Sequence, residues 1–117
     1  MTDNQRDKLN RFLAERVLGW TVTAYYCYPP GLSPESNVAH YRLPTFESLA
    51  DCEPLLNKIE RDGWKWMLAG EMFVGRERYE FAISKGTGGT IISQASSSRT
   101  EALRLAVGRA YGWKVEG

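Results

Sequence analysis

The sequence predicts an α+β domain in which an antiparallel sheet is covered by helices, as in an α/β/α sandwich, with the element order α-β-(β)-α-β-β-β-α. Three observations predict it. Helix-like segments end three times in a Gly-Trp pair, extended segments alternate apolar and polar residues, and glycine-containing turns separate the last strands. Antiparallel strands with helices before and after them are typical of this class. The three pairs are Gly19-Trp20, Gly63-Trp64 and Gly112-Trp113.

Length and composition predict a single domain over residues 1–117. Hydrophobic residues make up 43% and charged residues 25%, as in an ordinary globular protein. The 15 basic and 14 acidic residues give a net charge of +1. Affinity for nucleic acid grows with each phosphate that a basic side chain neutralises, so this nearly balanced charge argues against a nucleic-acid partner. No apolar run has membrane-spanning length and the first residues are polar, so we expect a cytoplasmic protein without a membrane partner.

The first helix is predicted over residues 3–18, because apolar residues recur there at the spacing of one helical face. Thr2 and Gln5 have the spacing of a capping box at its start. The next segment, 20–28, is rich in β-branched and aromatic residues and is predicted to be one strand.

Residues 29–44 are predicted to form an exposed, proline-containing loop or an irregular edge segment. Pro29, Pro30 and Gly31 end the preceding strand. Within this stretch, 38–43 is a candidate short strand, which Pro44 would confine to a sheet edge.

The second helix is predicted to begin near Asp51, which can cap it, because Pro54 is tolerated only in a first turn. Trp64 then opens a strand in which Gly70-Glu71 is predicted to form a turn or bulge. The other two strands of this antiparallel meander are predicted around Tyr79, Phe81 and Ile83 and over residues 90–95, with a glycine-rich turn at 86–89 between them.

The last helix opens with a capping-box pattern at Ser98 and Glu101 and ends before Gly112. The face predicted to be buried is made of small and branched residues, which would let the helix lie close to the sheet. These residues are Ala102, Leu103, Ala106, Val107 and Ala110.

Three segments resemble the phage ABA sandwich domain family, which consists of small proteins of bacteriophages and prophages. Residues 9–20, LNRFLAERVLGW, are similar to the start of that family, and residues 55–64, LLNKIERDGW, to its second helix. Residues 100–106, TEALRLA, resemble its final helix. The resemblance implies a sheet sandwiched by helices, a phage or prophage origin and a place in the host bacterial cytoplasm. It implies no catalytic residue.

A second resemblance, to the double-stranded RNA-binding domain, is the alternative. The order helix, three antiparallel strands, helix over residues 52–111 is that of the domain, and residues 96–102, SSSRTEA, resemble its approach to the last helix. Such modules contact phosphates and 2′-hydroxyls at the start of that helix. The nucleic-acid contacts implied by this alternative are Lys85, Arg99 and Arg104.

We expect no enzyme, cofactor or metal site. His40 is the sole histidine, and Cys27 and Cys52 have no metal-binding spacing, so no Cys/His, Ser/His or metal constellation is predicted. Both cysteines are expected to be reduced.

An aromatic cluster provides the candidate interaction surface. Because side chains alternate along a strand, neighbours such as Tyr25 and Tyr26 point to opposite faces, and Tyr28 and Trp66 add further aromatic area. Either helices bury both faces of the sheet, or an aromatic face contacts a partner. We therefore expect a phage accessory protein that binds another protein, with a host factor or a second copy of the chain as the alternatives.

Overall fold

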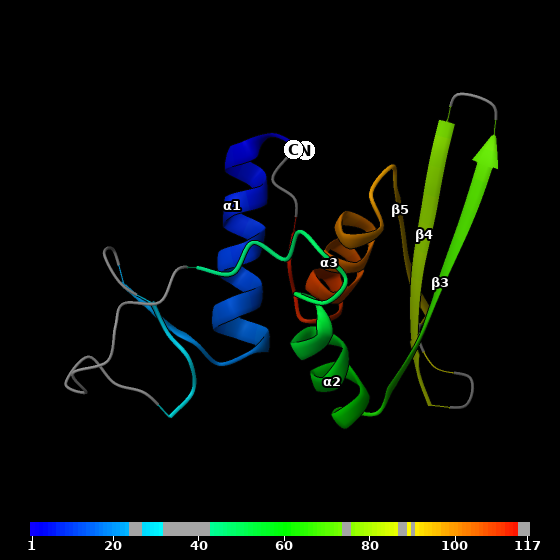
Figure 1. Ribbon diagram of the computed structural model, residues 1–117. Helices are drawn as coiled ribbons and strands as arrows, with labels where there is room; N and C mark the ends of the chain where they lie inside the picture. Colours follow the sequence, from blue (N-terminus) through cyan, green and yellow to red (C-terminus); the bar gives the residue numbers. More distant parts are fainter. Residues whose placement is uncertain (24–26, 32–42, 74–75, 87–88, 90, 115–117) are drawn as a thin grey trace.

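The computed structural model describes residues 1–23, 27–31, 43–73, 76–86, 89 and 91–114, and it has the predicted α+β order (Figure 1). The described residues form three α-helices, one π-helical turn and two antiparallel sheets. The elements are α1 (Asp3–Phe12), the π-helical turn η1 (Leu13–Val17), β1 (Thr21–Val22), β2 (Cys27–Tyr28), α2 (Glu53–Arg61), β3 (Trp64–Phe73), β4 (Arg76–Lys85), β5 (Ile91–Ser96) and α3 (Arg99–Ala110).

The larger sheet has the strand order β3-β4-β5, with antiparallel neighbours and β4 in the centre. Phe81 in β4 pairs with Leu68 in β3 and with Gln94 in β5, so these three side chains share one face. The helices lie on this face (Figure 1). Among the described residues no helix lies on the opposite face, where the side chains of Met67 and Ile91 are exposed. The described helices therefore form one layer on the sheet, where a three-layer sandwich would have two.

The hydrophobic core lies between the sheet and the helices. Phe81 and Ile83 project from β4 at 0% and 1% exposure, and the apolar faces of the helices pack over them. Gly108 allows α1 and α3 to approach closely, because a Cβ there would lie 2.9 Å from the Leu9 side chain. The core consists of Leu9, Leu13, Val17, Phe46, Cys52, Leu55, Ile59, Phe81, Ile83, Ala102, Leu103, Ala106 and Val107.

The Gly-Trp pairs end helical segments as predicted. Gly19, Gly63 and Gly112 all have positive φ, at 74°, 89° and 102°, which is the conformation that a side chain disfavours. After α3, the Trp113 amide donates to the Gly108 carbonyl at 2.7 Å and the Gly112 amide donates to Arg109, which is the hydrogen-bond pattern of a Schellman motif.

The helix starts confirm two predicted caps and correct a third. Thr2 and Gln5 form the predicted capping box of α1. The Ser98 hydroxyl caps α3 by accepting from the Glu101 amide, although the Glu101 carboxylate accepts from Ser96. Asp51 was the wrong cap for α2, because the helix begins at Glu53 with Cys52 at the N-cap position and no side-chain cap.

Two strand predictions were wrong in detail. Segment 20–28 is not one strand, because it folds back on itself so that Thr21 of β1 pairs with Tyr28 of β2. Gly70-Glu71 is neither turn nor bulge, since β3 and β4 pair without interruption from Trp64 to Phe73. The candidate strand at 38–43 lies, apart from Leu43, outside the described residues, as does most of the predicted loop at 29–44.

Truncating Phe81 tests the position of the core. We expect Phe81→Ala to lower the free energy of unfolding by about 3–5 kcal/mol, because the side chain is fully buried between sheet and helices. Met67→Ala on the next strand is the matched control, and its 63% exposure predicts a change within about 0.5 kcal/mol. Urea denaturation measures both. Equal losses in the two variants would contradict the one-sided core.

Candidate functional site

The exposed face of the three-stranded sheet is the first candidate site. Met67 is 63% exposed and Ile91 is 72% exposed, although both are large and apolar. Ala82 and Ser84 on the central strand are small, which leaves a shallow groove of about 310 Å³ between the outer strands. The groove is lined by Lys65, Trp66, Met67, Ala82, Ile83, Ser84 and Ile91.

Trp66 lies at the edge of this sheet and is held in place by two contacts. Its ring stacks on Phe81, with centroids 5.7 Å apart and an interplanar angle of 14°. Its indole N–H donates to the Glu60 carboxylate of α2 at 2.9 Å. Because Trp66 is still 40% exposed, it presents a fixed aromatic surface to solvent. Fixed aromatic side chains are common anchors of protein interfaces.

A charged cluster joins the ends of α2 and α3 beside this edge. The Tyr111 hydroxyl donates to Asp62, and Lys58 donates to the same carboxylate at 3.1 Å. Both hydrogen bonds lower the pKa of Asp62, and the bond from Tyr111 has the larger effect. Burial and the Asp62 bond raise the pKa of Tyr111. Lys85 lies 5.5 Å from the centre of the Trp64 ring, so the start of β3 is also held.

This cluster predicts a pH dependence of stability. A lowered pKa means that the Asp62 contacts stabilise the fold above the unfolded carboxyl pKa of about 3.9, and that this contribution is lost as pH falls through the folded pKa. Tyr111→Phe should therefore be less stable at pH 7 and lose less stability between pH 6 and pH 2. Urea denaturation across this range measures it. Tyr79→Phe, which removes a hydroxyl bonded to the exposed Glu77, should keep the wild-type pH profile; an unchanged profile in Tyr111→Phe would refute the assignment.

The structure does not gather the four predicted interface aromatics on one surface. Tyr28 is 4% exposed and belongs to the small β1-β2 sheet, so it is a core residue and does not belong to the candidate interaction surface. Tyr25 and Tyr26 lie outside the described residues. Trp66 is 40% exposed. Sequence reasoning missed Met67 and Ile91, although strict alternation from Trp66 and Ile92 would have placed both on the outward face.

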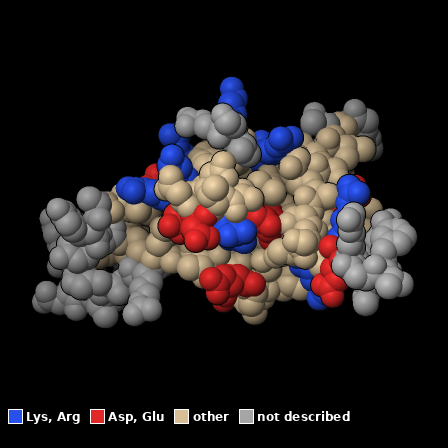
Figure 2. Space-filling model, turned by 90° about the horizontal axis from the view of Figure 1, so that it is seen from above, with Lys and Arg blue, Asp and Glu red and all other residues tan. Residues whose placement is uncertain are grey.

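A polar pocket of about 430 Å³ lies between the starts of α1 and α3 and is the second candidate site. Figure 2 shows this end of the molecule with acidic and basic side chains side by side and no continuous basic surface. Four carboxylates and two guanidinium groups line the pocket, so its formal charge is negative. The lining residues are Asp3, Arg6, Asp7, Asn10, Thr45, Glu47, Ser98, Thr100, Glu101 and Arg104.

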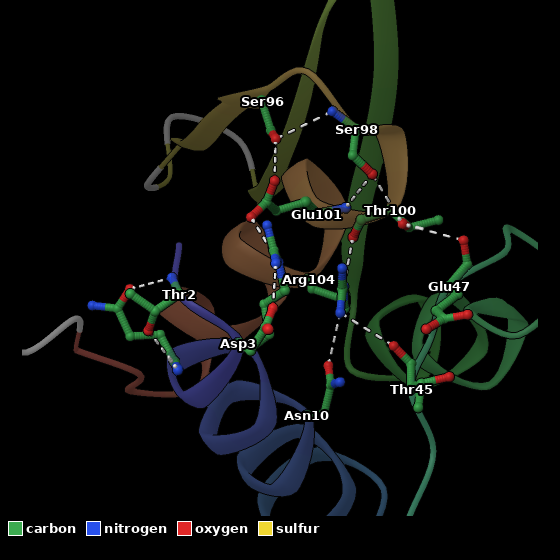
Figure 3. Close-up of polar contacts among 12 residues, drawn as sticks. Thr2, Asp3, Asn10, Thr45, Glu47, Ser96, Ser98, Thr100, Glu101 and Arg104 are labelled. Atoms are coloured by element: carbon green, nitrogen blue, oxygen red, sulfur yellow. Dashed lines mark hydrogen bonds and ion pairs between the residues drawn. The ribbon is translucent and has the colours of Figure 1, made fainter.

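Arg104 is the buried group at the bottom of this pocket, at 6% exposure (Figure 3). Its Nη1 donates to Asn10 Oδ1 at 2.9 Å and to the Thr45 carbonyl at 3.1 Å, while its Nε donates to the Thr100 carbonyl at 3.2 Å. Within the described residues no carboxylate forms an ion pair with it. Burial therefore lowers the pKa of Arg104. The guanidinium links three segments of the chain, which is a structural role.

Removing this guanidinium should destabilise the fold. Arg104→Met deprives three buried or half-buried oxygens of their donor, and we expect a loss of about 2–3 kcal/mol in the free energy of unfolding. Arg99→Met is the control, because Arg99 is exposed and lies 4.8 Å from the Tyr79 ring, a contact that contributes about 0.5–1 kcal/mol. Chemical denaturation compares them. A smaller loss in Arg104→Met than in Arg99→Met would contradict the linking role.

The three residues predicted for nucleic-acid contact are dispersed. Arg104 is buried, which corrects its predicted place on a binding surface. Arg99 lies over Tyr79, and Lys85 lies over Trp64 at the other end of β4, about 20 Å along the strand. Glu101 forms an ion pair with Arg6 next to the start of α3. The charges expected for a phosphate contact are therefore not brought together.

Comparison with known proteins gives no match: no family model matches the chain, and neither a curated protein nor a solved structure is significantly similar to it. In the part of the chain that the structure describes, no helix combines the length and apolar character needed to cross a bilayer. The same residues contain no group of three potential metal ligands, and His40 lies outside them.

Proposed function

We propose that this chain is a protein-binding module that acts through the exposed face of its three-stranded sheet. One observation carries the proposal: Met67 and Ile91 are 63% and 72% exposed on either side of a groove with a small-residue floor. Large apolar side chains grouped on an open surface are typical of a contact site. The ring of Trp66 stacks on Phe81 on the helix-covered face of the sheet, so it lies outside this contact surface.

The resemblance of residues 9–20 and 55–64 to phage ABA sandwich proteins supports placing this binder among phage or prophage accessory proteins, with a host factor as one partner class. The cysteines favour binding over catalysis. Burial raises the pKa of Cys52 to about 11 and also raises the pKa of Cys27, so both thiols stay protonated at neutral pH. A protonated, buried thiol is a poor nucleophile.

The element order α2-β3-β4-β5-α3 supports the double-stranded RNA-binding alternative, but the distribution of charges opposes it. Arg99 is exposed at the start of α3, but Glu101, Glu47 and Asp3 line the pocket beside it. Carboxylates at this position repel the phosphates that such a module has to contact. Protein binding is therefore the better supported function.

An outward charge on the sheet tests the proposal. We expect tagged Ile91→Glu to capture at least tenfold less partner from a bacterial lysate than the tagged wild-type protein does. The reason is that the added carboxylate would lie in the apolar contact. Leu49→Glu is the matched control, since Leu49 is 41% exposed before α2 and away from the groove. Mass spectrometry of the captured proteins measures the effect.

Two results would contradict the proposed function. Equal capture by wild type, Ile91→Glu and Leu49→Glu would show that the groove is not part of the interface. Capture that nuclease treatment abolishes, and that falls steeply with salt and with Arg99→Glu, would favour the RNA-binding alternative.

A further inference from the structure

The polar pocket between the starts of α1 and α3 contains a buried positive charge with hydrogen-bond donors to spare. Arg104 donates through Nε and Nη1, whereas its Nη2 donates to no described group. Asn10 accepts from Nη1 through Oδ1, which leaves its Nδ2 without a described acceptor. The two residues are 6% and 5% exposed, and Figure 3 shows their side chains next to each other. Two unused donor groups thus lie together on buried side chains.

Both of these nitrogens reach solvent through the pocket. In the described part of the chain, Trp113 Nε1 is the only fully enclosed side-chain polar atom without a hydrogen bond, so Arg104 Nη2 and Asn10 Nδ2 are not enclosed. Both residues line the pocket. A carboxylate has two oxygens that accept from such neighbouring N–H groups, and a guanidinium donor makes these bonds stronger. The bottom of the pocket therefore fits the carboxylate of a ligand.

Two carboxylates without partners lie nearer the mouth of the pocket. Asp7 is on the same face of α1 as Asn10, one turn closer to the start of the helix. Glu47 is two residues after Thr45, whose carbonyl accepts from Arg104. Asp7 and Glu47 are exposed, and neither carboxylate has a hydrogen bond or ion pair with a described residue. They form a negative rim around the buried guanidinium.

The other charges that line the pocket are already engaged with one another. Arg6 lies 3.0 Å from Asp3 and 3.7 Å from Glu101. Glu101 also accepts from the Ser96 hydroxyl at 2.6 Å. Among the described groups, this leaves one uncompensated positive charge at the bottom and two uncompensated negative charges at the rim. The rim would repel a simple anion and the guanidinium would repel a simple cation, so the pocket fits a ligand that carries both charges.

The segment that carries Glu47 is fixed in place by α3. Arg104 donates to the Thr45 carbonyl at 3.1 Å, and the Thr100 hydroxyl donates to the Glu47 carbonyl at 3.5 Å. Between these two carbonyls, Phe46 has a φ of 51° and a side chain that is 1% exposed. A bulky residue at positive φ is uncommon and persists only where surrounding contacts hold it. One side of the rim is therefore positioned by the fold itself.

We propose that this pocket binds a free basic amino acid, with its α-carboxylate on Arg104 and Asn10 and its two cationic groups at Asp7 and Glu47. L-lysine and L-arginine each have one negative and two positive charges, as this arrangement requires. The volume of about 430 Å³ lies in the range of small-molecule sites. The inference goes beyond the proposed protein-binding function and does not depend on it, because the pocket and the groove on the sheet share no residue.

A series of ligands tests this order of charges. NMR titration of the wild-type protein should show saturable binding of L-lysine or L-arginine with a Kd of about 1 mM or tighter, and the side-chain amide signals of Asn10 should shift. Cadaverine lacks the carboxylate of lysine, and norleucine lacks its side-chain ammonium. Each should bind at least about tenfold more weakly than L-lysine, because each leaves a charged group of the pocket without its partner.

Asn10→Asp tests the buried guanidinium without removing it. An aspartate keeps the oxygen that accepts from Arg104 and adds a fixed counter-ion, so this variant should bind L-lysine at least about tenfold more weakly. Glu47→Gln and Asp7→Asn should each weaken binding by about threefold or more. Glu53→Gln is the matched control, because Glu53 is exposed at the start of α2 and lies outside the pocket. Urea denaturation checks that every variant is folded.

Two results would overturn the inference. One is that neither amino acid binds the wild-type protein saturably at concentrations up to about 10 mM. The other is that cadaverine binds as tightly as L-lysine, or that Asn10→Asp binds as tightly as Glu53→Gln, because attraction of a cation to surface carboxylates would then explain the binding. Ile91→Glu separates this site from the proposed protein contact, since it should bind L-lysine as the wild type does while partner capture is lost.

Discussion

The buried guanidinium of Arg104 is the interaction on which the arrangement of the helices depends. This one side chain donates to oxygens of three segments that are far apart in the sequence. These segments are α1, the stretch that precedes α2, and α3. Its acceptors are neutral, so the charge is solvated by fixed dipoles and by no ion pair within the described residues. Such a group costs free energy to bury and is stable only when its donors are satisfied. It therefore fixes one relative placement of the three segments.

That placement puts all the described helices on one side of the larger sheet. Phe81 and Ile83 are then buried on the covered face, whereas the other face keeps Met67 and Ile91 in solvent. The exposed sheet is a consequence of one-sided packing, because three helices that pack on each other and on one face leave none for the second face. The proposed contact surface arises from this asymmetry.

Local signals in the sequence were reliable where they concerned single backbone positions. The Thr2 capping box, the Ser98 cap and the positive φ of the three glycines before tryptophan all follow from the chemistry of a few adjacent residues. Predictions that needed distant partners were less successful. The break of segment 20–28 into a hairpin, the continuity of β3 through Gly70 and the burial of Tyr28 depend on what packs against each segment, which propensity does not record.

The sequence by itself determined the class, the order of the elements and the places where helices end, because hydrophobic period and terminal chemistry are local properties. It also contained the residues of the candidate surface, but without assigning them. Only the tertiary structure decided that Arg104 is a buried link, that Tyr28 lies in the core and that Met67 and Ile91 are exposed. The physical reason is that burial depends on which face of an element meets another element, and that choice is made by packing across the whole chain.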